Sequence, residues 1–144
     1  MGVEPPTHKP QYEIMGGKES VVKQLKAAAK EADVIYVATD PDREGEAIAA
    51  HVVNILGKEH RPKISRITYT EINKKAIDKA ITNKRHVDWK LVSAQELRRV
   101  IDRYVGYMIS PVLTKRLKSS ENRSSLTAGR VQSIALRLIV ERDQ

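Results

Sequence analysis

The sequence predicts an α/β unit with a parallel sheet and flanking helices, followed by an all-α segment. Helical and strand-like apolar patterns alternate through the first part of the chain, as they do where parallel strands are joined by helices. After the basic tripeptide at residues 84–86 the strand patterns stop, and the remaining apolar residues repeat at helical spacing. We therefore expect two domains within 144 residues.

The first domain is expected over residues 13–86, after a disordered lead at residues 1–12 that contains three prolines and no apolar periodicity. Apolar residues at helical spacing predict its helices. The continuous run from Val34 to Ala38 predicts a strand covered on both faces. In chain order, the expected elements are a helix over 19–32, a strand over 34–38, a helix over 47–56, a strand over 63–69 and a helix over 71–81.

The second domain, residues 87–144, is expected to be helical throughout. Asp88 should cap a helix that runs to about Tyr107. A separate short helix should begin at Ser110-Pro111 and end near Leu117, because serine caps helices and proline is tolerated in a first turn. The buried stripe of the long helix is expected to consist of Leu97, Val100, Ile101, Tyr104 and Met108.

The end of the chain continues this helical pattern. Residues 118–125 (KSSENRSS) are expected to be a polar connection, and Thr127 is expected to cap a last helix. The apolar pattern of that helix is still incomplete at Gln144, which predicts that the domain is truncated at its C-terminal end.

Charge and composition narrow the function classes. The net charge is +8, and residues 88–144 contain 8 arginines and 3 lysines, against 4 and 11 in residues 1–87. Because the planar guanidinium holds phosphate oxygens in fixed geometry, the second domain has the character of an anion-binding surface. The absence of cysteine excludes disulfides and thiolate metal sites, and the four histidines are too scattered for a zinc site. No apolar run is long enough for a membrane span, so we expect a soluble, cytoplasmic protein.

The segment DPDREGE, residues 40–46, follows the predicted buried strand and precedes a helix. Open parallel sheets bind ligands beyond the carboxyl ends of their strands. Asp40 and Asp42 point the same way in an extended segment, and a divalent cation would relieve the repulsion between them. The alternative is a solvated turn whose acids favour the positive end of the helix, with Arg43 as a surface partner.

The string ATDPDREGEAIA resembles the Toprim motif of type IA DNA topoisomerases of the bacterial type. ISRITYTEINKKAI is similar to the next strand and helix of that domain, and VDWKLVSAQELRRVIDRYVGYMISPVL and LTAGRVQSIALRLIVER are similar to the family's following helices. Ala50 replaces the usual tryptophan, Leu97 replaces the usual alanine, and the KSSENRSS connection is longer than typical. None of these departures removes a carboxylate or an arginine.

The resemblance implies a partial Toprim domain in a fragment of an enzyme that relaxes supercoiled DNA. In that family a tyrosine attacks one strand, forms a 5′-phosphotyrosyl bond and later allows religation. Asp40, Asp42 and Glu44 would hold Mg²⁺ and position the strand ends. The family's first strand, with its catalytic glutamate, is not recognisable before Tyr12, and the nucleophile is expected beyond Gln144. The isolated fragment is therefore expected to be inactive, and a monomer near the bacterial nucleoid.

Arginines on the long helix are the first candidate strand-binding residues. Spacings of three and four residues place Arg98, Arg99, Asp102 and Arg103 side by side with Gln95. The alternative is a surface lattice of Arg98–Asp102 and Arg99–Asp102 ion pairs. The resemblance implies instead that Arg98 and Arg99 contact phosphates of single-stranded DNA, while Asp102 orients them or meets the strand.

The start of the last helix is the second candidate. Helix N-termini offer free N–H groups to phosphate, and the resemblance to the family's SAGRVQS motif implies that TAGRVQ, residues 127–132, binds the strand. Arg130 would hold a phosphate, Gln132 would reach a sugar or base edge, and Gly129 would permit close backbone approach. The alternative is an ordinary Thr127 cap beside an unrelated arginine.

The five tyrosines are expected to be structural. Tyr36 lies in the predicted buried strand, and only Tyr107 is placed where its hydroxyl could touch the DNA strand. Two other function classes remain open: another Toprim enzyme, such as a primase or an OLD-type nuclease, and a non-catalytic DNA-binding module. The LTAGRVQS segment disfavours another Toprim enzyme. Dependence on a metal would distinguish a topoisomerase fragment from a non-catalytic DNA-binding module.

Overall fold

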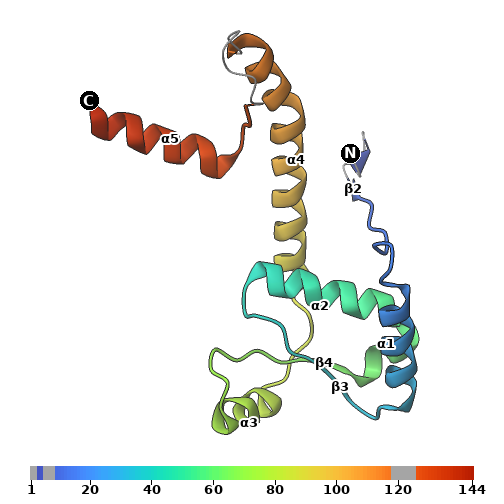
Figure 1. The fold of residues 1–144 in the computed structure, drawn as a ribbon. Helices are drawn as coiled ribbons and strands as arrows, with labels where there is room; N and C mark the ends of the chain where they lie inside the picture. The colour runs from blue at the N-terminus through green and yellow to red at the C-terminus, as the bar shows by residue number, and fades with distance from the viewer. Residues whose placement is uncertain (1–2, 5–8, 118–125) are drawn as a thin grey trace. The chain divides into compact units, whose positions relative to one another are not determined.

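The computed structural model describes residues 3–4, 9–117 and 126–144 (Figure 1). Contacts divide the chain into two compact units, residues 12–96 and the described parts of residues 1–11 and 97–144. Asp88 and Gln95 bond to α2 within the unit of residues 12–96, and the expected domain boundary at residues 86/87 stays a prediction. None of the helices in the described part of the chain combines the length and apolar character needed to cross a bilayer.

The unit of residues 12–96 has the predicted α/β order. Figure 1 shows α2 and α3 on opposite sides of the pair of strands. The elements are helix α1 (Glu19–Glu31), strand β3 (Ile35–Val37), helix α2 (Arg43–Leu56), the 3-10 helix η1 (Lys58–Lys63), strand β4 (Ile64–Arg66) and helix α3 (Lys74–Thr82), followed by the start of helix α4 (Trp89–Leu117).

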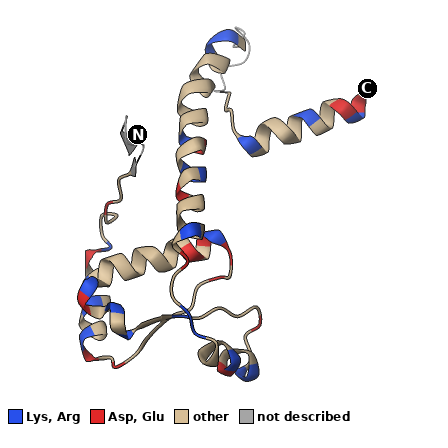
Figure 2. Cartoon of the chain, turned by 180° about the vertical axis from the view of Figure 1, so that it is seen from behind, with Lys and Arg blue, Asp and Glu red and all other residues tan. Residues whose placement is uncertain are grey.

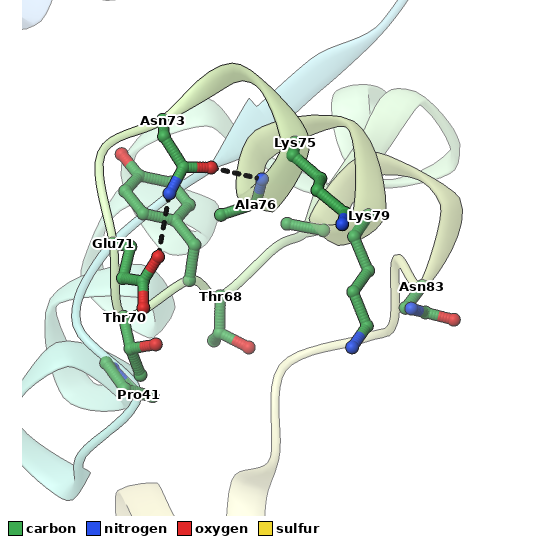
Figure 3. Close-up of a pocket in the computed structure, with 11 residues that line it drawn as sticks. Pro41, Thr68, Thr70, Glu71, Asn73, Lys75, Ala76, Lys79 and Asn83 are labelled. Atoms are coloured by element: carbon green, nitrogen blue, oxygen red, sulfur yellow. Dashed lines mark hydrogen bonds between the residues drawn. The ribbon is translucent and has the colours of Figure 1, made fainter.

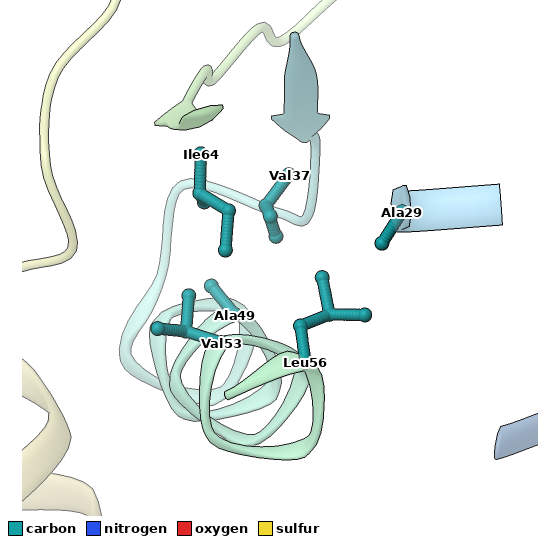
Figure 4. Close-up of a cluster of buried hydrophobic side chains, with 6 residues drawn as sticks. All are labelled: Ala29, Val37, Ala49, Val53, Leu56 and Ile64. Atoms are coloured by element: carbon teal, nitrogen blue, oxygen red, sulfur yellow. The ribbon is translucent and has the colours of Figure 1, made fainter. Parts of the chain in front are cut away.

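The two strands are parallel, as predicted, with Ile35 opposite Ile64 and Val37 opposite Arg66. Apolar side chains of α1, α2 and both strands form the core beside this sheet (Figure 4). Burial of this apolar surface stabilises the unit and fixes where β3 ends. The core residues are Ala29, Val37, Ala49, Val53, Leu56 and Ile64.

Strand β3 is not covered on both faces, contrary to the expectation from its apolar run. Val37 is buried, but the side chain of Tyr36 is 41% exposed. Successive side chains of a strand point to opposite faces. Val37 packs into the core beside α2, and Tyr36 points to the other face. The placement of Tyr36 in a buried strand interior was therefore wrong.

Two short strands occupy part of the expected disordered lead. Strand β1 (Val3–Glu4) pairs antiparallel with strand β2 (Lys9–Pro10). A hydrogen-bonded pairing of only two residues on each strand is too short to show an alternation of apolar and polar residues. The sequence pattern therefore could not predict these strands. The expectation for residues 1–2 and 5–8 lies outside the described residues.

Helix α4 is a single element, and the separate helix expected from Ser110-Pro111 is not formed. Asp88 caps it as predicted, because Asp88 Oδ1 accepts the N–H groups of Lys90 and Leu91 at 2.9 and 3.3 Å. Pro111 lies inside the helix. Proline carries a helical φ angle, so here it removes one backbone hydrogen bond without ending the helix.

The expected apolar stripe of α4 is mostly exposed. Val100 is buried, but Leu97 is 61% and Met108 is 64% exposed. Ile101 is 45% exposed and Tyr104 is half-buried. Helical spacing predicts which residues share a face, but burial requires a partner element. The described residues do not cover this face.

Helix α5 (Arg130–Asp143) begins two residues later than expected, and Gly129 rather than Thr127 is its N-cap. The preceding segment is bonded to α4. The Ser110 hydroxyl accepts the Ala128 N–H at 2.9 Å, and Thr114 Oγ1 accepts the Leu126 N–H at 3.0 Å. These bonds hold Thr127 outside the helix, so the predicted threonine cap was wrong. The predicted connection at residues 118–125 lies outside the described residues.

Candidate metal and nucleic-acid site

The acidic loop, residues 40–46, begins after the carboxyl end of β3 and enters α2. Asp42 is the N-cap of α2, and its Oδ1 accepts the Gly45 N–H at 2.7 Å. The Thr39 hydroxyl donates to the Gly45 carbonyl at 2.5 Å. A carboxylate is favourable here because the first N–H groups of a helix lack partners and carry partial positive charge. These bonds fold the loop closely against the first turn of α2.

The close approach of the Asp40 backbone to the first turn of α2 requires a glycine at position 45. A Cβ at this position would overlap the backbone carbonyl and amide of Asp40. Backbone atoms cannot move aside as a flexible side chain can, so any larger residue would displace the loop. Gly45 therefore brings Asp40 beside the start of α2.

Arg66 holds the other side of the loop. Its side chain on β4 is fully buried. Its guanidinium donates to the carbonyls of Thr39 and Asp40, each at 2.7 Å. It also donates to the carbonyls of Val37 and Ile67. The five donors of a guanidinium have fixed geometry. Arg66 thus fixes the backbone from the end of β3 to the first carboxylate.

Glu46 is the buried partner of Arg66. Its Oε2 accepts from Arg66 Nε at 3.1 Å, and its two oxygens accept from Arg85 at 2.8 and 2.9 Å. Burial alone would raise the pKa of the Glu46 carboxyl. Hydrogen bonds from Arg85 and from the backbone N–H of Asp88, with the two guanidinium charges, lower this pKa from 4.5 to about 2. Glu46 is therefore a charged structural residue.

The same turn of α2 is bonded to the beginning of α4, where charged segments gather in Figure 2. Glu46 Oε1 accepts the Asp88 N–H at 2.6 Å, and Glu44 Oε2 accepts from Gln95 Nε2 at 2.9 Å. Gln95 is 4% exposed, and its Oε1 has no hydrogen-bond partner among the described residues. Gln95 thus orients Glu44 and leaves a buried amide oxygen beside it.

The donor chemistry of the loop fits a hard divalent cation. The side chains of Asp40, Asp42 and Glu44 are all exposed, and carboxylate and amide oxygens are the ligands that Mg²⁺ takes. Asp40 has no side-chain partner among the described residues. Across residues 3–4, 9–117 and 126–144, no group of three His, Cys, Asp or Glu side chains is gathered closely enough to hold a metal ion. The loop therefore offers a partial ligand set.

The arginines of α4 and the start of α5 are joined by one ion pair. Arg130 donates to both carboxylate oxygens of Asp102, at 2.5 and 2.6 Å. This hydrogen bond lowers the pKa of the Asp102 carboxyl, and the charge of Arg98 contributes. The alternative ion-pair lattice of Asp102 with Arg98 and Arg99 is not formed among the described residues. The structure thus joins two candidates that the sequence could only place separately.

Other predicted strand-binding residues surround this pair. Arg98, Arg99 and Arg103 are exposed on α4, and the side chain of Tyr107 is 61% exposed. Gly129 provides no side-chain cap for α5, and the Gln132 amide folds against it. The first N–H groups of α5 therefore remain without a capping side chain, as an anion-binding helix end requires.

Sequence reasoning did not identify Arg66, Arg85, Glu46 and Gln95 as a supporting network. Arg66 offered a signal, because a charged residue within an apolar strand pattern must find a partner or an exposed face. Arg85 lay in the basic tripeptide at residues 84–86, and Gln95 lay in the predicted long helix. Their partners are 39 and 51 residues away in the chain.

Comparison with known proteins finds similar proteins over the whole chain. A family model of the Toprim domain matches residues 3–72, and a model described as DNA topoisomerase matches residues 86–144. Over its whole length the chain is 46% identical to DNA topoisomerase 1 of Pseudomonas aeruginosa and to that of Pasteurella multocida. It spans 16% of the length of each of these relatives.

The structure is similar to full-length topoisomerase I of Thermotoga maritima, with a TM-score of 0.82 and 41% identity over 99% of this chain and 23% of that chain. The second family model covers residues 86–144, which include the LTAGRVQS segment. Because the two models follow one another along the chain and its relatives match all of it, this chain belongs to the bacterial type IA DNA topoisomerase family, with a Toprim segment followed by a helical segment.

Proposed function

We propose that this chain supplies the acidic loop and the strand-binding helices of an enzyme that relaxes supercoiled DNA by transient single-strand cleavage and religation. The observation that carries the proposal is the loop itself, which presents exposed carboxylates at the carboxyl end of a parallel strand. The names of the relatives support the DNA substrate. We place the chain as a monomer in the bacterial cytoplasm, on nucleoid DNA.

In this proposal Asp40, Asp42 and Glu44 hold Mg²⁺, which supplies positive charge beside phosphate oxygens when bound. Arg66 and Gly45 fix the loop backbone, and Gln95 fixes Glu44. Preorganised groups of this kind position the ends of a broken strand without rearranging during the reaction. None of the tyrosines of this chain is proposed as the nucleophile, so the chain alone should form no covalent adduct with DNA.

Single-stranded DNA is proposed to lie on the surface formed by Arg98, Arg99, Arg103, Tyr107 and the first turn of α5. Arg130 is already held beside α4 by Asp102, so its guanidinium is oriented before the strand arrives. The uncapped N–H groups of α5 add neutral donors for phosphate. Thr127, Gly129 and Gln132 are proposed to line the approach to sugar or base edges.

Titration with Mg²⁺ should shift the amide resonances of residues 40–46, with an affinity on the order of 1 mM or weaker. Asp40→Asn should abolish the response, because it removes the one loop carboxylate without a protein partner. Asp33→Asn, an equal charge change at an exposed residue before β3, should leave it intact. Shifts centred outside the loop would reject the metal assignment.

Arg99→Ala and Arg130→Ala should each weaken the binding of a short single-stranded oligonucleotide. Each lost phosphate contact should flatten the slope of log K against log salt by about 0.7. Lys26→Ala, at an exposed lysine of α1, should leave the slope unchanged. Fluorescence anisotropy at several salt concentrations measures all three. Equal weakening by the Lys26 and Arg99 substitutions would show diffuse electrostatic binding without a defined site.

A non-catalytic DNA-binding module is the second candidate, favoured by the lack of a three-ligand metal cluster among the described residues. The response to Mg²⁺ distinguishes this binding module from the proposed topoisomerase fragment. A simple binding module should hold the oligonucleotide equally well with and without Mg²⁺, and its acidic loop should not respond to the metal.

A further inference from the structure

A cavity of about 440 Å³ lies beside the acidic loop (Figure 3). Pro41, which separates the first two carboxylates of the loop, forms part of its wall. The rest comes from the segment after β4 and from α3. The lining residues are Pro41, Thr68, Tyr69, Thr70, Glu71, Asn73, Lys75, Ala76, Lys79, Ala80 and Asn83.

The charged groups of this cavity are mainly uncompensated cations. Lys75 and Lys79 are four residues apart on α3, and neither has a carboxylate within ion-pair distance among the described residues. Glu71 is the acidic residue in the lining, and its Oε2 already accepts from Asn73 Nδ2 at 2.7 Å. Figure 3 shows the two lysine side chains extending along the same side of α3. The cavity therefore favours an anion.

Neutral donors complete the lining. The side chains of Thr68, Thr70 and Asn83 have no hydrogen-bond partner in the part of the chain that the structure describes. Hydroxyl and amide groups beside ammonium groups are the usual protein contacts to phosphate oxygens. The cavity also follows the carboxyl end of β4, the edge at which parallel sheets bind ligands.

We infer that this cavity binds a phosphate group of the DNA strand that reaches the acidic loop, with Lys75 and Lys79 supplying the charge. The inference rests on the proposed function, because it adds a phosphate contact for the DNA strand that the acidic loop would hold. A free phosphate ion or a small phosphorylated ligand has the same chemistry, so the test must separate the two sources.

The test compares the whole chain with Lys75→Gln/Lys79→Gln, which removes both charges and leaves a polar, uncharged side chain at each position. A single-stranded oligonucleotide should shift the amide resonances of Lys75, Lys79 and Asn83 in the unsubstituted chain. The double substitution should weaken binding about threefold to tenfold. It should also flatten the salt slope by about 1, and by no more than about 1.4.

The matched control is Lys26→Gln/Lys30→Gln, which changes the same charge at the same spacing on exposed positions of α1. Equal effects of the two double substitutions would overturn the inference and leave the proposed function standing. Failure of the unsubstituted chain to bind the oligonucleotide would overturn both. Saturation of the Lys75 and Lys79 resonances by inorganic phosphate, with no response to the oligonucleotide, would assign the cavity to a small ligand instead of DNA.

Discussion

Glu46→Gln should lower the free energy of unfolding of the α/β unit by about 3 to 5 kcal/mol. Glu46 and Arg66 are both fully buried, and the substitution leaves the guanidinium of Arg66 without its counter-charge. It also replaces an acceptor of the Arg85 side chain and the Asp88 N–H with a neutral amide. Removing one partner of a buried ion pair costs more than the pair itself contributes, because the remaining charge stays desolvated.

The Glu46 carboxylate makes the free energy of unfolding of the α/β unit depend on pH. Its pKa is about 2 in the folded chain and 4.5 ordinarily, so the unfolded state binds the proton first as pH falls. The stabilisation is complete above pH 4.5 and is lost between about 4.5 and 2. The shift corresponds to about 3 kcal/mol, of which about 2 kcal/mol should be lost at pH 3.

Urea unfolding at pH 7 and pH 3 measures both effects. Glu46→Gln should lose stability at pH 7 and show little of the pH-dependent decrease. Glu19→Gln, the same change at an exposed position of α1, should stay within about 0.5 kcal/mol of the unsubstituted chain. If Glu46→Gln is as stable as this control, the buried charge network does not hold the unit together.

Gly45→Ala should be the second most damaging substitution, with a loss of about 2 to 3 kcal/mol. The added methyl group overlaps the Asp40 backbone, so the loop must move away from α2. That movement breaks the bond from Arg66 to the Asp40 carbonyl. We therefore expect weaker Mg²⁺ binding together with lower stability.

Gly106→Ala provides a control within α4, where a Cβ would meet nothing within 4 Å. Alanine is the better helix former, so this change should stabilise the helix by about 0.5 to 1 kcal/mol. Thermal unfolding and Mg²⁺ titration of both variants test the argument. A Gly45→Ala chain with unchanged stability and unchanged loop resonances would show that the approach of Asp40 to α2 is not tight.

The sequence pattern correctly predicted several features that are decided by residues close together in the chain. The helical spacing before β3, the apolar strands and the Asp88 cap were all predicted, and all are formed. The position of the acidic loop after a parallel strand was predicted for the same reason. Each of these features is decided by residues within a few positions of one another.

Errors arose where the local pattern did not decide the structure. Pro111 predicted a helix break, yet α4 continues through it. Thr127 predicted a cap, yet bonds from Ala128 and Leu126 to α4 keep it outside α5. The apolar stripe of α4 predicted burial, yet Leu97 and Met108 are exposed. Helix propensity and residue spacing indicate which local structure a segment favours. Tertiary contacts decide which of the possible local structures is formed.

The sequence by itself determined the α/β order, the charge distribution and the loop that carries Asp40, Asp42 and Glu44. Only the tertiary structure decided how that loop is held, through Arg66 from β4 and Gln95 from α4. It alone paired Arg130 with Asp102, 28 residues apart. The physical reason is that charged and polar side chains bond to groups that lie close to them in space, and chain order does not specify those neighbours.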